Sequence, residues 1–191
     1  YKGKRGKWNN TDFYQLGFAS YKQKDYENAI SELNKIVSGN NSISQNAYYH
    51  LGESYIKLDK KQEALNAFRN ASQMDYDLKI QEDAWLNYAK ISYEIGNSYQ
   101  SAPQVLAGYL EKYPDTSYKE EIETLLIDSY ITSKNYKEAL KLLESKKSFE
   151  KCIKAAPTYL GIKVLYAHYY MAKEDDKKNF KKLLNEVVNS K

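Results

Sequence analysis

The stretch YYHLGESYIKLDKKQEALNAFRNASQMDY, residues 48–76, decides the fold of this chain. Tyr48, Leu51 and Tyr55 recur at spacings of three and four residues, which places them on one face of a helix. A second helix is predicted after a short polar turn, with Phe68 on its inner face. Because Gly52 is small, the two helices can approach closely there, and aromatic side chains fill the space around the contact. One such pair cannot bury both of its faces, so it needs neighbours stacked against it.

The same unit recurs along the chain. Leu16 and Leu51 are 35 residues apart, and so are Ala29 and Ala64, close to the period of about 34 residues of one class of helical repeat. We therefore predict an all-α fold, a right-handed α-solenoid of antiparallel helix pairs with about four repeats and a divergent C-terminal helix pair. The expected segments are a basic flexible arm at 1–10, a solenoid at 11–146 with repeats near 11–43, 44–79, 80–116 and 117–146, and a divergent helical segment at 147–191. Thr11 or Asp12 is the expected N-cap of the first helix.

The repeat register breaks near residues 145–149. Phe149, Cys152 and Pro157 have the spacing of a second-helix ending, but they follow soon after Leu143, which already holds the equivalent aromatic position. Either one long helix covers roughly residues 136–156, or the junction joins segments that are not adjacent in the natural chain. The sequence leaves both explanations open.

Composition narrows the classes of function. The chain has 29 basic and 25 acidic residues and a net charge of +4. This mixed charge differs from the one-sided basic stripe that is typical of nucleic-acid binding proteins. An RNA-binding helical repeat is therefore a disfavoured alternative. No apolar run approaches the roughly 18 residues that a membrane span needs. Because the chain opens at Tyr1, we expect a fragment or a processed form.

Catalytic and metal-binding patterns are not recognised in the sequence. His50 and His168 have no acidic or cysteine partner at ligand spacing, and Cys152 has no paired base. There is no phosphate-binding loop and no nucleophile elbow. We expect a non-enzyme with no metal and no cofactor.

The pattern of large, Leu-Gly, aromatic, Ala and aromatic residues resembles the tetratricopeptide repeat (TPR) family, over roughly residues 13–143. The resemblance implies a concave groove lined by the first helix of each repeat, which would bind a peptide or helix of another protein. Counted on helical faces, the candidate groove positions are Tyr14, Phe18, Tyr21, Lys22, Tyr49, Glu53, Ile56, Lys57, Leu86, Lys90 and Tyr93. Self-association through the same residues is the alternative, since apolar exposed surface marks a contact site of either kind.

The members of this family that bind chaperone tails use a basic and amide clamp for a terminal carboxylate. Here four of the five clamp positions hold Tyr14, Phe18, Glu53 and Leu86, and only Lys90 is basic. The resemblance therefore argues against binding of acidic chaperone C-termini.

Two further resemblances bear on location. The ending KYPDT, residues 112–116, resembles repeats of bacterial cell-envelope proteins, which implies a periplasmic or envelope-associated location, with a cytoplasmic one as the alternative. The tail from Phe149 to Val188 is similar to the helical TatT component of TRAP transporters. That likeness implies a second class of function, a transport accessory protein that acts through self-assembly.

Overall fold

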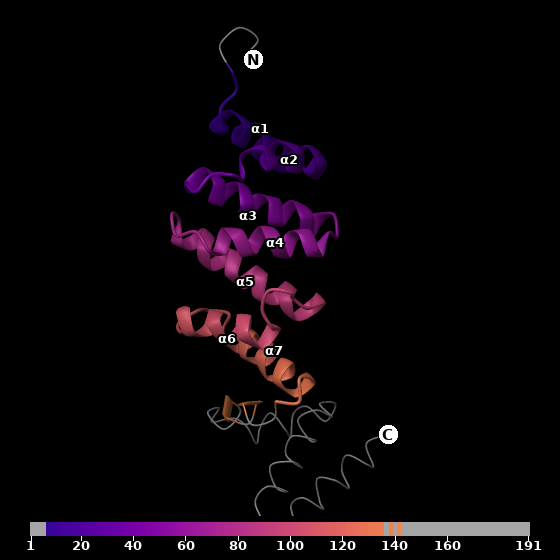
Figure 1. The fold of residues 1–191 in the computed structure, drawn as a ribbon, viewed down its shortest axis with the longest axis vertical. Coiled ribbons are helices and arrows are strands. Elements are labelled where there is room, and N and C mark those ends of the chain that lie inside the picture. The colour runs from indigo at the N-terminus through magenta and orange to yellow at the C-terminus, as the bar shows by residue number, and fades with distance from the viewer. Residues whose placement is uncertain (1–6, 136–137, 140, 143–191) are drawn as a thin grey trace, which may run out of the picture. The chain divides into compact units, whose positions relative to one another are not determined.

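A computed structural model of the chain describes residues 7–135, 138–139 and 141–142, and its ribbon is shown in Figure 1. All regular structure in these residues is helical, which confirms the predicted α-solenoid of helix pairs. The helices are α1 (Asn10–Lys22), α2 (Tyr26–Leu33), the 3-10 turn η1 (Asn34–Ile36), α3 (Ser42–Lys57), α4 (Lys61–Ser72), α5 (Leu78–Ile95), α6 (Ala102–Lys112) and α7 (Lys119–Thr132). None of them is long and apolar enough to cross a bilayer.

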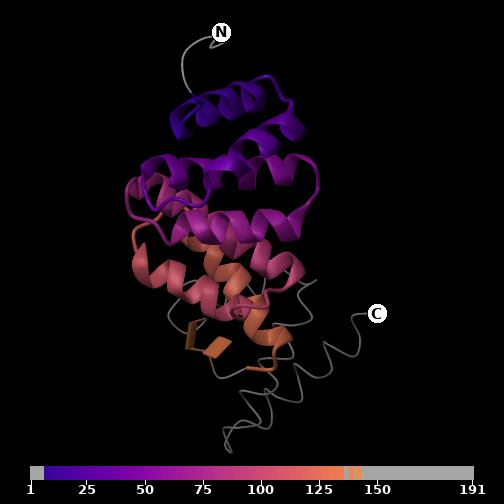
Figure 2. The same ribbon diagram turned by 45° about the horizontal axis from the view of Figure 1, so that its top comes forward.

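The chain divides into two compact units, residues 1–114 and 115–191. In the first unit, α1, α3 and α5 are the first helices of three pairs, and α2, α4 and α6 are the second helices. Each helix contacts its neighbours in the sequence, and α3 also contacts the other two first helices. The stacking of α1 to α4 is visible from a second direction in Figure 2. The first helices therefore share one side of the stack.

In the first two pairs, the two helices meet at a glycine. A Cβ built on Gly17 would lie 2.7 Å from Cγ of Leu33, and one built on Gly52 would lie 2.8 Å from three ring carbons of Phe68. The two contacts occupy equivalent repeat positions, because both members are displaced by 35 residues. The sequence-based expectation of a close approach at Gly52 is confirmed.

The turn between paired helices also repeats. Lys24, Asp59 and Lys134 have left-handed backbone angles, with φ of 63°, 55° and 60°. The next amide in each turn donates to a carbonyl five residues earlier, and for Asp25 and Ser20 the N–O distance is 2.9 Å. This is the Schellman arrangement, which satisfies carbonyls at the end of a helix and usually places glycine in the left-handed position.

Successive repeats are joined through a buried glutamine. Nε2 of Gln45, on α3, donates to the carbonyl oxygens of Ala71 at 3.4 Å, Met74 at 2.8 Å and Asp77 at 3.1 Å. Oε1 of Gln45 accepts from the amide of Asp77 at 2.8 Å. One side chain thus satisfies four backbone groups at the end of α4 and in the connection to α5.

Some predicted boundaries need correction. The N-cap of α1 is Asn9, not Thr11 or Asp12: Oδ1 of Asn9 accepts from the amide of Asp12 at 3.0 Å, and Oδ2 of Asp12 accepts from the amide of Asn9 at the same distance. Asp12 is therefore the N3 residue of a capping box whose N-cap is Asn9. In the third pair, the turn between the helices has a different geometry, with Gly96 at φ of 77° directly after α5. Asn97 then closes the loop by donating to the hydroxyl of Tyr88 at 2.7 Å.

In the second unit, α7 packs Ile127 against Ala139, with Tyr130, Ile131 and Leu142 around them. Most of the predicted second helix of the fourth repeat, the register break at 145–149 and the segment 147–191 with Cys152 lie outside the described residues.

Candidate functional site

The first helices α1 and α3 bring together a group of aromatic side chains around His50. The ring centroid of His50 lies 6.2 Å from that of Tyr14, 4.9 Å from Phe18, 5.1 Å from Tyr21 and 5.4 Å from Tyr49. We call Tyr14, Phe18, Tyr21, Tyr49 and His50 the aromatic cluster. All five side chains are partly exposed, so the cluster forms surface as well as packing.

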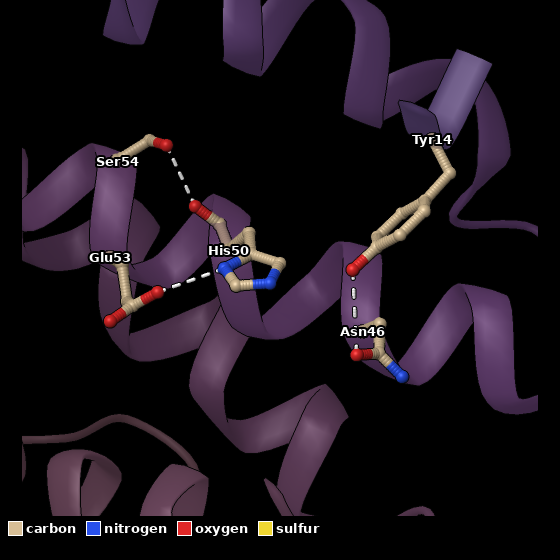
Figure 3. Close-up of polar contacts among 5 residues, drawn as sticks. All are labelled: Tyr14, Asn46, His50, Glu53 and Ser54. Carbon is tan, nitrogen blue, oxygen red and sulfur yellow. Dashed lines mark hydrogen bonds and ion pairs between the residues drawn. The ribbon is translucent and has the colours of Figure 1, made fainter. Parts of the chain in front are cut away.

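His50 is held in place from its own helix. Its Nδ1 lies 2.9 Å from Oε2 of Glu53, and its carbonyl oxygen accepts from Oγ of Ser54 at 2.7 Å. Across the cluster, the hydroxyl of Tyr14 donates to Oδ1 of Asn46 at 3.5 Å. Figure 3 shows these contacts. The helix spacing of three residues explains why His50 and Glu53 meet.

Glu53 also acts on two tyrosines. Burial raises the pKa of Tyr21 to about 12, with further contributions from the charge of Glu53 and a hydrogen bond to it. Burial likewise raises the pKa of Tyr49 well above its usual value, and the charges of Glu53 and Asp83 add to the effect. Both phenols therefore remain protonated donors over the physiological range of pH.

Asp83 brings a second carboxylate to this side of the stack, from α5. Burial raises its pKa, the charge of Lys79 opposes the increase, and the nearby charges of Glu82, Glu53 and Asp77 add to it. Lys22, on α1, lies with its ammonium 5.1 Å from the ring centroid of Phe18 and 5.8 Å from that of Tyr21. The contacts of the cluster thus combine aromatic rings, the carboxylate of Glu53 and the ammonium of Lys22.

All eleven predicted groove residues lie on α1, α3 or α5, and whether they bind a partner stays a prediction. Tyr14, Phe18, Tyr21 and Tyr49 belong to the aromatic cluster, and Glu53 contacts it through His50. Lys22, Ile56 and Lys57 are exposed. Ile56 is 38% exposed. Lys90 and Tyr93, on α5, are partly buried.

Leu86 corrects the prediction of an exposed position. It is only 6% exposed, on a helix that packs against α3, α4 and α6. Tyr49 also has a structural role, since its ring meets that of Phe68 edge-on at 5.9 Å. A Tyr49→Ala change would therefore disturb packing as well as the surface.

Sequence reasoning missed His50 and Asp83. His50 had no partner at metal-ligand spacing, but the spacing of three residues to Glu53 was a signal for a helical hydrogen bond. In the described part of the chain, no group of three or more His, Cys, Asp or Glu side chains could hold a metal ion. The site offers hydrogen bonding, ring stacking and charge.

A separate apolar depression lies at the start of the first repeat. It has a volume of about 510 Å³ and is lined by Lys7, Trp8, Phe13, Leu16, Glu32 and Lys35. Leu16 is 40% exposed there, whereas the equivalent Leu51 is 2% exposed between repeats. This difference shows how much burial a neighbouring repeat supplies.

Comparisons with known proteins support the fold. A family model described as anaphase-promoting complex, cyclosome, subunit 3 matches residues 4–71, which is less than half of the chain. No curated protein matches the sequence.

Several solved structures are similar in fold. A TPR repeats protein from Bacteroides fragilis has 14% identity and a TM-score of 0.55, over 95% of this chain and 85% of that one. MamA has 15% identity and a TM-score of 0.54, over 95% and 91%. A Podosopora anserina protein with TPR-like repeats of the kinesin-light-chain type has 14% identity and a TM-score of 0.51, over 94% and 93%. At these identities the likeness shows the fold alone, which is of the TPR type.

Proposed function

We propose that this chain, whose fold is of the TPR type, is a non-catalytic scaffold that binds a segment of another protein along its first helices. The observation that carries the proposal is the aromatic cluster, in which four rings surround His50 on the side shared by α1 and α3. The exposed Ile56 extends this surface. The partner segment would lie across α1, α3 and α5, as an extended peptide or a helix.

The physical basis is favourable for binding. Tyrosine is enriched at the energetic centres of protein interfaces, because a large rigid ring and a hydroxyl are immobilised at low entropic cost. Here the rings are already held by mutual contact and by Glu53. A partner would therefore meet a surface that needs little ordering, which raises affinity for a given contact area.

The test compares a variant of the proposed groove with a control variant at an exposed aliphatic residue elsewhere. Ile56→Ser, combined with Tyr21→Ser, removes surface from the proposed groove, whereas Leu78→Ser removes an exposed side chain at the start of α5. Proteins captured from a native extract by immobilised wild type and by both variants would be identified, and the solution mass and thermal unfolding of each protein recorded.

A partner that binds wild type and Leu78→Ser but not the groove variant would support the proposal. Equal capture by all three proteins would refute it. Capture of nothing beyond the chain itself, with a solution mass above that of a monomer, would favour the self-assembling transport accessory instead.

A further inference from the structure

The apolar depression at the start of the first repeat is the counterpart of an interface inside the chain. A shift of 35 residues takes four of its lining residues onto members of the apolar cluster that joins the first two repeats. The correspondences are Trp8 with Ile43, Phe13 with Tyr48, Leu16 with Leu51, and Glu32 with Ala67. We call the surface around Trp8, Phe13 and Leu16 the N-terminal face.

Inside the chain, this kind of surface is covered by α2 and η1. Ala29 and Leu33 of α2 and Ile36 of η1 are fully buried in the same cluster as Leu51, and α2 packs against α3. These three residues have the spacing i, i+4 and i+7, which is the apolar stripe of an amphipathic helix. The chain itself therefore shows which kind of element the surface accepts.

At the N-terminal face the corresponding positions are open. Trp8 is 44% exposed and Leu16 is 40% exposed. The ring of Trp8 lies beside that of Phe13, with 5.5 Å between the centroids, so the three side chains form one continuous apolar patch around the depression. A contiguous exposed apolar patch of this kind marks a contact site.

The charges beside the patch favour a single helix over a whole helix pair. Ala67 is 5% exposed between the repeats, but Glu32 takes its place at the N-terminal face and pairs with Lys35 at 2.6 Å. A complete pair stacked here would remove this ion pair from water, which is costly. A single helix along α1 would cover the apolar residues and leave Glu32 and Lys35 at its edge.

Lys7 gives the face a charge that a partner can complement. It is exposed and lines the depression, and no acid in the described part of the chain lies within ion-pair distance of it. An acidic residue on the docked helix would therefore be attracted to this side of the face. The helix α2, which covers the inner counterpart, has Asp25 at its N-cap and Glu27 in its first turn.

We propose that the N-terminal face binds a single amphipathic helix of a partner protein, which lies along α1 as α2 lies against α3. Its apolar residues would have the spacing of Ala29, Leu33 and Ile36, and an acidic residue would lie beside Lys7. This surface shares no residue with the proposed groove, and the inference does not rest on the proposed function. A scaffold with both surfaces could hold two partner segments at once.

The test uses a fluorescent peptide with the sequence DYENAISELNKIV, residues 25–37, because this segment covers the equivalent surface inside the chain. The control peptide carries Leu33→Ser and Ile36→Ser. Binding to the full chain would be followed by fluorescence anisotropy, and thermal unfolding and solution mass would be recorded for every protein. The proteins are wild type, Leu16→Ser, Lys7→Gln, the control Leu78→Ser at another exposed leucine, and the groove variant Tyr21→Ser with Ile56→Ser.

Wild type, Leu78→Ser and the groove variant should bind the peptide saturably and with similar affinity. Leu16→Ser should bind it about tenfold more weakly or worse, as expected when a leucine that becomes buried on binding is lost. Lys7→Gln should weaken binding by about two- to fivefold, as expected for an exposed ion pair, and should reduce its dependence on salt. The control peptide should not bind, which tests the inference even if Leu16→Ser is unstable.

Several outcomes would overturn the inference. They are failure of wild type to bind the peptide, equal binding of the control peptide, and binding that survives Leu16→Ser but is lost in the groove variant. A wild-type mass above that of a monomer that falls to a monomer in Leu16→Ser would show that a second copy of the chain covers the face instead. The capture experiment on the groove is read independently, so failure here leaves the proposed function standing.

Discussion

Replacing Gly52 by alanine tests the contact on which the helix pairs are built. The new Cβ would lie 2.8 Å from three ring carbons of Phe68, whereas carbon atoms pack best at about 3.5–4.0 Å. The ring must therefore move by roughly 0.7 Å or more within a close-packed interior, which costs about 1–3 kcal/mol. Alanine in a helix is favoured over glycine by about 1 kcal/mol. The net expectation for Gly52→Ala is a loss of about 1 kcal/mol.

Gly108 is the matched control, because it also lies within a helix. A Cβ at Gly108 would lie 3.4 Å from Cζ2 of Trp85, which is an ordinary contact. Gly108→Ala should therefore raise the free energy of unfolding by up to about 1 kcal/mol. Both variants would be measured by urea unfolding, followed by circular dichroism at the helical band.

A second background makes the steric explanation specific. Phe68→Val lacks the ring carbons that approach Gly52, so Gly52→Ala in that background should be neutral or stabilising. The reasoning is refuted if Gly52→Ala stabilises the otherwise unchanged protein as much as Gly108→Ala does, or if its cost persists after Phe68→Val.

Three further predictions concern the turns, the tyrosines and the junction between repeats. Lys24→Gly and Asp59→Gly should each raise stability in urea by up to about 1 kcal/mol, because left-handed angles strain other residues; a loss in both would contradict the turn geometry. The folded-state pKa of Tyr21 is about 12 against an ordinary 10.0. Between these values the unfolded chain releases the phenol proton while the folded chain keeps it, so the free energy of unfolding falls as pH rises from 10 to 12. Tyr21→Phe should make that fall shallower, with the raised pKa of Tyr49 still contributing to it, and an unchanged pH profile would argue against the shift at Tyr21. Gln45→Leu should cost about 2–4 kcal/mol, since it leaves buried backbone groups unpaired, and a thermal melt like that of wild type would show that water replaces the amide.

The fold was predictable because its signals repeat. Gly17 and Gly52, with their facing residues, recur at the same spacing as the turns, so each repeat supports the prediction for the next. The N-cap was misplaced because Asn9 follows a basic stretch with no helical period. Asn, Thr and Asp are all good N-cap residues, so residue type alone does not show which of them forms the capping box. Local hydrogen bonds of this kind shift helix ends without changing the helices.

The candidate site was predictable only in part. Helical periodicity identified Tyr14, Phe18, Tyr21 and Tyr49 as residues on one side, but periodicity cannot show which rings touch. His50 became central because its side chain turns toward α1. Leu86 was misjudged because periodicity assigns a residue to a face of a helix but does not show which part of that face neighbouring side chains cover. The envelope-associated location stays a prediction that no contact in the structure tests.

The amide of Gln45 has a consequence for how such a protein can change over evolutionary time. Its hydrogen bonds span the connection from Ala71 to Asp77, so an insertion or deletion there would displace at least one bonded backbone group. The loop around Gly96 and Asn97 already departs from the common turn and is closed by its own side chains. We expect related sequences to vary in length within the helix pairs, at their turns, and to keep the connections between pairs constant. Duplication of whole pairs would then be the natural route by which the array grows.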